Sequence, residues 1–256
     1  MLLRINSVAT FAVSILLLGS CTEPDRARHI LERTFKAHGA ENLQNAISEF
    51  HFRGELYRAS RNSGVFAFER VYEDSLGTVR DLLTNDGSFR EVNGERTPID
   101  DSTAFSIQEK VNSVVYFSSL PLPLKDPAVL TQYLGTSQID GQAFHEVEVT
   151  FRQLGGGPDH EDRFVYWINS HSDLIEYFAY YYLTNETGSR FRRLVNPRVV
   201  GGFLAFDHLN YAARPDTIGS RVEQFDDLLQ KGALEIISDV KHENFRVVPL
   251  DRTPSR

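Results

Sequence analysis

The densest group of potential metal ligands in this sequence lies in the run Gly155–Asp162, which contains Asp159, His160 and Asp162. Carboxylate oxygens suit Ca²⁺ or Mg²⁺, and an imidazole nitrogen suits Zn²⁺. The run lacks the alternating aspartates of a calcium loop, and no second histidine stands three or four residues away to complete a zinc site. The pattern therefore favours a solvated hairpin loop in which glycine supplies positive φ. A metal-assisted hydrolase that uses these three side chains is the alternative.

Motifs for other kinds of catalysis are missing from the sequence. It contains no Gly-x-Ser-x-Gly or His-Glu-x-x-His motif, and its only cysteine is Cys21. The formal net charge is −8, and no stretch is rich enough in Lys and Arg to bind nucleic acid. We therefore expect a non-enzymatic protein that needs no cofactor and binds no nucleic acid.

Cys21 stands at the end of a segment that is typical of a signal peptide. Arg4 precedes an apolar run from Val8 to Leu18, which is too short to span a bilayer. The following residues, Leu18-Gly19-Ser20-Cys21, resemble the lipobox of bacterial lipoproteins. The resemblance implies a signal peptide over residues 1–20, lipidation of Cys21 and a tether over residues 21–24. It also implies a lipid anchor in the cell envelope of a Gram-negative bacterium, with the outer membrane as the expected location.

The elements that follow the tether predict a mainly β protein with a few helices. An apolar stripe at helical spacing predicts a helix over residues 25–38, and a weaker stripe predicts one over 100–116. Period-two alternation punctuated by turn residues predicts an antiparallel meander over 48–93. Further strands are expected at 144–151, 164–168, 174–183, 190–195, 199–206, 208–212, 234–240 and 245–248, with a short helix near 222–229.

Two of these strands, 164–168 and 174–183, are apolar on both faces. Such strands are covered on both sides, so we expect them in the middle of the sheet with helices on one face. The fold class that follows is α+β, mainly β: a strongly curved antiparallel sheet or incomplete barrel closed by two or three helices. Residues 25–250 are expected to form a single domain. Across this sheet, Arg190 and Arg192 are expected to meet Glu146 and Glu148.

The segment 118–127 is apolar and holds three prolines, which exclude it from a helix interior and from a central strand. It is either a connector packed on the core or a flap over an apolar groove. The flap hypothesis predicts a ligand site between this segment and the doubly apolar strands. Its expected lining residues are Phe164, Tyr166, Ile168, Tyr180, Tyr182, Leu122 and Leu124.

Two resemblances support this interpretation. The lipobox, a first helix ending at His38-Gly39 and the strand Phe50-Phe52-Gly54 resemble the start of outer-membrane lipoprotein-sorting (Lol-type) proteins. That family implies a curled antiparallel sheet whose helices close a cavity for acyl chains. The sequence resembles an uncharacterised lipoprotein family of Gram-negative bacteria more closely. The segments that carry this resemblance are Val111–Phe117, Leu120-Pro121, Gly155–Asp162, Tyr166–Asn169 and Arg190–Arg192.

The function predicted from the sequence is that of a membrane-anchored envelope lipoprotein that binds an apolar or amphipathic ligand in a sheet-lined cavity. Its partners would be the membrane, through lipidated Cys21, and the apolar ligand. Two alternatives stay open. One is the metal-assisted hydrolase, and the other is a non-catalytic interaction module of an envelope complex.

Overall fold

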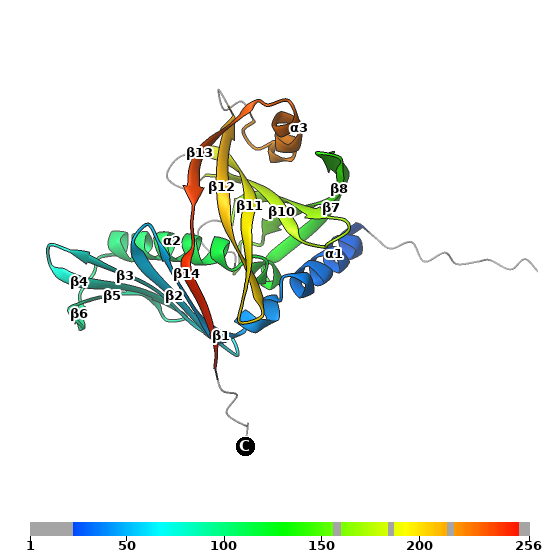
Figure 1. Ribbon diagram of the computed structural model, residues 1–256. Coiled ribbons are helices and arrows are strands. Elements are labelled where there is room, and N and C mark those ends of the chain that lie inside the picture. The colour runs from blue at the N-terminus through cyan, green and yellow to red at the C-terminus, as the bar shows by residue number, and fades with distance from the viewer. Residues whose placement is uncertain (1–22, 156–159, 184–186, 214–217, 251–256) are drawn as a thin grey trace, which may run out of the picture.

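The computed structural model describes residues 23–155, 160–183, 187–213 and 218–250, so Cys21 and Asp159 lie outside the described residues. Its strands form two antiparallel sheets of seven strands each, on which helices pack (Figure 1). The predicted fold class, mainly β with curved antiparallel sheets and a few helices, is confirmed. The strands are divided between two sheets, which we call sheet A and sheet B.

Sheet A contains the predicted meander, and its hairpins are tight. The turns at Arg53-Gly54 and Asn93-Gly94 have positive φ at both residues, which is the conformation of two-residue hairpins that match the twist of a sheet. In spatial order, sheet A runs through β14 (Glu243–Pro249), β1 (Asn45–Phe52), β2 (Glu55–Asn62), β3 (Val65–Asp74), β4 (Gly77–Thr84), β5 (Gly87–Val92) and β6 (Glu95–Thr97).

Sheet B holds the strands that are apolar on both faces. In spatial order it runs through β13 (Leu234–Val240), β12 (Phe203–Ala213), β11 (Gly188–Val200), β10 (Ile175–Tyr182), β9 (Arg163–Asn169), β8 (Gln142–Phe151) and β7 (Val129–Ile139). The predicted strands 164–168 and 174–183 correspond to β9 and β10, which lie inside the sheet as expected. Strand β7 was not predicted, because Thr, Gln, Ser and Gly interrupt its apolar residues.

The strand boundaries predicted around residues 196 and 207 are wrong. β11 continues through Asn196-Pro197, where its register against β12 shifts, so the proline sits at an irregularity and not in a regular ladder. Asp207 lies inside β12, and its carboxylate accepts a hydrogen bond from Arg198 at 2.9 Å. The hairpin turn between the two strands is Gly201-Gly202, and both of these residues have positive φ.

The helices cover one face of sheet A and both faces of sheet B (Figure 1). α1 (Glu23–Ala37) packs on sheet B beside β7, and α2 (Asp101–Ser118) packs on sheet A. The opposite face of sheet B is covered by η3 (Val222–Gln224) and α3 (Phe225–Gln230), whereas η1 (Ala40–Leu43) and η2 (Leu122–Lys125) are short connectors. Within the described part of the chain, no helix has the length and hydrophobicity needed to cross a membrane.

A shared apolar cluster joins the two sheets. Phe50, Tyr57 and Phe245 of sheet A pack with Phe203 and Ala205 of sheet B. The chain also crosses directly from one sheet to the other, because β13 and β14 are consecutive in sequence and belong to different sheets (Figure 1). These contacts fix the angle between the sheets and therefore the shape of the space between them.

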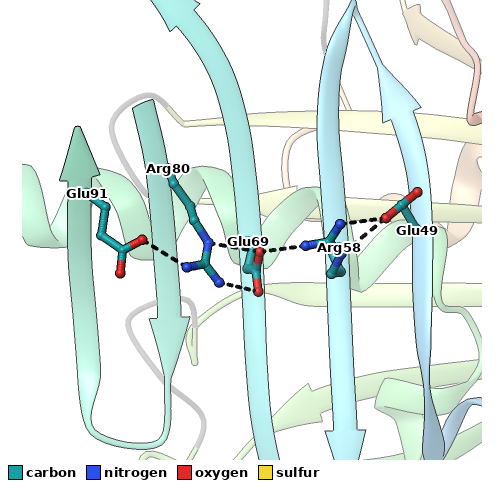
Figure 2. Close-up of polar contacts among 5 residues, drawn as sticks. All are labelled: Glu49, Arg58, Glu69, Arg80 and Glu91. Carbon is teal, nitrogen blue, oxygen red and sulfur yellow. Dashed lines mark hydrogen bonds and ion pairs between the residues drawn. The ribbon is translucent and has the colours of Figure 1, made fainter. Parts of the chain in front are cut away.

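The face of sheet A that points away from α2 carries a ladder of ion pairs (Figure 2). Arg58 contacts Glu69 at 3.3 Å, and Arg80 contacts the same carboxylate at 2.8 Å. The ladder continues to Glu49 at one end and Glu91 at the other, so it crosses five adjacent strands. Each of its two arginines therefore lies between two glutamates, and opposite charges alternate along the ladder.

Candidate ligand-binding site

A cavity of about 1450 Å³ lies between the two sheets and α2. Its walls come from three places: the α2-facing side of sheet A, one side of α2 with the connector that follows it, and the adjoining side of sheet B. Small-molecule sites commonly measure about 300–1,000 Å³, so this space is large for a single compact ligand. It could hold one or more extended chains.

The sheet A wall follows from alternation along the strands. Tyr57, Ala59 and Arg61 of β2 point to the same face, because successive side chains of a strand alternate. The register places Phe68 of β3 opposite Ala59, with Phe66 opposite Arg61. The rings of Phe66 and Phe68 have their centroids 4.7 Å apart and form an aromatic floor.

The helix wall is held in place by packing on sheet A. The carboxylate of Asp100 accepts a hydrogen bond from the Thr103 N–H at 2.8 Å and begins α2. One stripe of the helix is then buried against Ala59 and Leu83 through Ile107, Val111 and Val115. The neighbouring stripe, which includes Val114 and Phe117, lines the cavity.

The sheet B wall is aromatic. Phe164 of β9 lies opposite Tyr180 of β10, and their ring centroids are 5.5 Å apart. Phe117 from α2 packs against the same group, and its ring centroid lies 5.5 Å from that of Phe178 and 5.3 Å from that of Tyr180. Aromatic rings arranged in this way present a continuous apolar surface with hydroxyl groups at its edge.

The structure divides the predicted ligand-site residues into two groups. Four of them line the cavity: Phe164, Tyr180, Tyr182 and Leu122. The other three are buried in the core under α1 and do not line it: Tyr166, Ile168 and Leu124. Tyr166 is held there by a 3.0 Å hydrogen bond between its hydroxyl group and that of Tyr116, and burial raises the pKa of both phenols.

The proline-rich segment combines the two roles that the sequence left open. Leu120 and Leu124 are buried in the core of sheet B, as a packed connector would be. Leu122 and Pro123 lie between them in sequence and line the cavity. The segment is therefore anchored on both sides of the residues that it contributes to the cavity wall.

The structure places two of the three predicted metal ligands, His160 and Asp162, at the start of the segment that leads into β9. Asp159 lies outside the described residues, while Asp162 is almost fully buried and lines the cavity. Among the described residues, no group of three His, Cys, Asp or Glu side chains is placed to hold a metal ion.

The predicted ion pairs of Arg190 and Arg192 with Glu146 and Glu148 are wrong, because β9 and β10 lie between the strands concerned. Glu148 pairs with Arg163 of the adjacent β9 instead. Arg192 donates a hydrogen bond to the Tyr180 hydroxyl group at 2.9 Å and lines the cavity.

Sequence reasoning missed the whole sheet A wall of the cavity, including Arg61, Phe66 and Phe68. The alternation of residues 66 and 68 was visible, but it does not reveal that helix α2 leaves part of this face uncovered. The one local signal was an arginine that follows two largely buried residues on the same face of its strand, because Arg61 shares this face with Tyr57 and Ala59.

Comparison with known proteins places the fold but supplies no activity. A DUF1329 family protein from Desulfovibrio piger matches with a TM-score of 0.50 and 10% identity, over 88% of this chain and 93% of that one. A LolA superfamily protein from Nitrosomonas europaea matches with a TM-score of 0.44 and 13% identity, over 72% and 84%. A putative outer membrane lipoprotein-sorting protein domain from Vibrio parahaemolyticus matches with a TM-score of 0.42 and 9% identity, over 90% of this chain and 95% of that one. No curated protein matches the sequence significantly.

The expected resemblance to an uncharacterised family is confirmed. The sequence pattern of one protein family matches residues 8–242, which are most of the chain and include all the residues that line the cavity. The chain belongs to this family, which is described as a family of unknown function (DUF6503).

Proposed function

We propose that this protein binds an apolar or amphipathic ligand, whose hydrocarbon part occupies the cavity between the two sheets. The observation that carries the proposal is the cavity itself, which measures about 1450 Å³ and has sixteen Phe, Tyr, Val and Leu residues among those that line it. Burial of apolar surface is the main driving force for such binding. A long alkyl chain would gain about 0.8 kcal/mol for each CH₂ group removed from water.

The packing around the cavity supports a pre-formed site. α2 is fixed to sheet A through Ile107, Val111 and Val115, and its end is fixed to sheet B through Phe117. The space between these anchors is left open while the surrounding cores are filled. A ligand therefore does not have to separate the sheets to enter, which lowers the cost of binding.

Equilibrium dialysis with radiolabelled monoolein, a neutral lipid with one alkyl chain, tests the proposal. Val114→Trp would fill part of the cavity from α2 and is expected to weaken binding at least about tenfold. The matched control is Val199→Trp, because Val199 is 73% exposed and does not line the cavity. Absence of monoolein binding to the wild-type protein, or equal binding by the two variants, would contradict the proposal.

We also propose that the domain over residues 25–250 is held at the cell envelope by lipidated Cys21, behind a signal peptide over residues 1–20 and a tether over 21–24. The sequence Leu18-Gly19-Ser20-Cys21 supports this proposal. A bacterial lipoprotein anchor carries more than one acyl chain, and two chains are enough for stable attachment. Metabolic labelling with radioactive palmitate should label the wild-type protein and not Cys21→Ala, and membrane fractionation should identify the outer membrane as its location.

A further inference from the structure

The charge of the cavity is opposite to that of the whole protein. The formal net charge of the chain is −8, yet seven Lys and Arg residues line the cavity against four Asp and Glu. Part of this positive charge is neutralised locally: Arg70 contacts Glu55 at 2.5 Å and Asp81 at 3.8 Å. Two other arginines of the cavity wall, Arg61 and Arg192, have no carboxylate within ion-pair distance among the described residues.

Arg61 is the more deeply buried of these cations. Its Nη2 donates a hydrogen bond to the Ser119 hydroxyl group at 3.0 Å, and its guanidinium carbon lies 4.7 Å from the centre of the Phe68 ring. Its Nη1 is buried and has no hydrogen-bond partner. Burial lowers the pKa of Arg61 to about 10, so the guanidinium group still carries its charge at neutral pH. A buried charged donor without an acceptor is costly, so this N–H group is an unsatisfied donor in a residue of the cavity wall.

Arg192 repeats this arrangement on the sheet B side. Its guanidinium carbon lies 4.1 Å from the centre of the Phe117 ring, and its Nη2 is bonded to the Tyr180 hydroxyl group. Its Nε is buried without a hydrogen-bond partner. Phe117 and Ser119 are two residues apart at the C-terminal end of α2, so both arginines contact this helix end, one from each sheet. The helix dipole favours cations there, but it supplies no acceptor for the two unpartnered N–H groups.

Other arginines inside sheet A are paired with carboxylates. Arg58 lies on the same strand as Arg61, on the opposite face, and contacts two glutamates, as does Arg80 (Figure 2). Arg90 pairs with Asp81 at 2.6 Å on the same face as Arg61. These central arginines of sheet A therefore have carboxylate partners, whereas no ion pair is found for Arg61 or Arg192 at the end of α2 among the described residues.

We propose that the ligand is an anionic amphiphile, whose carboxylate or phosphate group binds Arg61, with Arg192 as the second cation, while its alkyl chain lies along Val114 and Phe164. A guanidinium group matches both oxyanions, because its N–H groups can donate two parallel hydrogen bonds. This inference rests on the proposed function and names the ligand class for the same cavity.

Equilibrium dialysis with three lipids that share one oleoyl chain tests the proposal: neutral monoolein, oleate, and 1-oleoyl lysophosphatidic acid. The wild-type protein is expected to bind at least one of the anionic lipids at least tenfold more tightly than monoolein. Tighter binding of oleate identifies a carboxylate ligand, and tighter binding of the lysophosphatidic acid identifies a phosphate ligand. Inorganic phosphate at millimolar concentration should not displace either lipid, and displacement would overturn the amphiphile in favour of a site for free oxyanions.

Arg61→Gln is expected to remove most of the anionic preference and to leave monoolein binding within about twofold. Arg58→Gln, on the outer face of the same strand, is the matched control and should retain the preference. Arg192→Gln should reduce it, and Arg61→Lys should restore part of it, which keeps the test valid if Arg61→Gln does not fold. Equal binding of all three lipids to the wild-type protein would overturn this inference and leave the proposed function standing. Failure of all three to bind would remove both.

Discussion

The two sheets have the same number of strands and the same antiparallel pairing, but they differ in what covers them. Sheet B is covered on both faces, by α1 and the proline-rich segment on one side and by η3 and α3 on the other. Its inner strand β9 is therefore apolar on both faces, as in Val165, Tyr166 and Trp167, which are fully buried. Sheet A is covered on one face, and its other face carries the ladder of glutamates and arginines (Figure 2).

This difference explains where the cavity lies. Most of the sheet B core is filled by the helices on its two faces, and only an aromatic edge that includes Phe164, Tyr180 and Tyr182 borders the cavity. On sheet A, α2 covers the strands only in part, so Phe66 and Phe68 stay partly uncovered and line a space that no side chain fills. Sheet B thus acts as the rigid support, and sheet A with α2 forms the open side of the site.

The largest effect should come from truncating the same residue type in each sheet. Phe178→Ala in sheet B removes a ring that is 0% exposed and contacts Phe117 and Tyr166. We expect it to lower the free energy of unfolding by about 3–5 kcal/mol. Phe66→Ala in sheet A removes a ring that already faces a cavity, so its cost should be at least about 1 kcal/mol smaller, because fewer neighbours lose contacts. Urea denaturation of both variants measures the difference, and equal costs would contradict the contrast between the sheets.

A smaller effect should depend on pH and arise where α1 meets sheet B. The Nε2 of His38 accepts a hydrogen bond from the Ile175 N–H at 3.0 Å, and burial lowers the pKa of this histidine to about 3. The unfolded chain takes up this proton near pH 6.5 and the folded chain does not. The contribution of neutral His38 to the free energy of unfolding is therefore fully present above pH 6.5. It falls as the pH drops toward 3, by about 1.4 kcal/mol per pH unit.

Burial also lowers the pKa of His208 and His242, which act in the same direction. Urea denaturation at pH 7.5 and pH 5.5 measures how steeply the free energy of unfolding changes with pH when all three histidines contribute. His38→Gln should be less stable at pH 7.5 and should show a flatter slope between the two values. His29→Gln is the control on the same helix, because its side chain is 63% exposed, and it should leave the slope unchanged. An unchanged slope in His38→Gln would show that this histidine is not the group responsible.

The smallest effect is expected in the ladder of sheet A. Glu69→Gln removes the carboxylate shared by Arg58 and Arg80, and we expect it to lower the free energy of unfolding by about 1 kcal/mol. The difference from wild type should shrink in 1 M NaCl, because salt screens partly exposed charges. Glu95→Gln, at an exposed position of β6, is the control and should have almost no effect. A loss that salt does not reduce would assign the ladder a packing role in place of an electrostatic one.

The sequence allowed the fold class and the core of sheet B to be predicted for a physical reason. Strands covered on both faces must be apolar on both faces, and residues 164–168 and 174–183 are the clearest examples. The division into two sheets was not predictable in the same way. This division depends on the short connection between β13 and β14, which belong to different sheets. Only Lys241 and His242 separate these two strands, and no local sequence pattern marks the change of sheet.

The candidate site was predicted on one side only. Phe164, Tyr180 and Tyr182 were identified because aromatic alternation on β9 and β10 is visible in the sequence. Arg61 and Phe66 were missed, because alternation assigns a face to a residue but does not show which part of that face a helix leaves uncovered. Tyr166 and Ile168 share the face of Phe164 and are buried under α1, so shared orientation alone did not identify the lining.

The most direct test of the account is to locate the bound alkyl chain. Oleate that carries a photoreactive diazirine group in the middle of its chain should crosslink to α2 near Val114 and to β9 or β10 near Phe164 and Tyr180, as mapped by mass spectrometry of peptides. Excess unlabelled oleate should abolish these adducts. Adducts confined to exposed apolar residues outside the cavity, such as Ile236, would contradict the account.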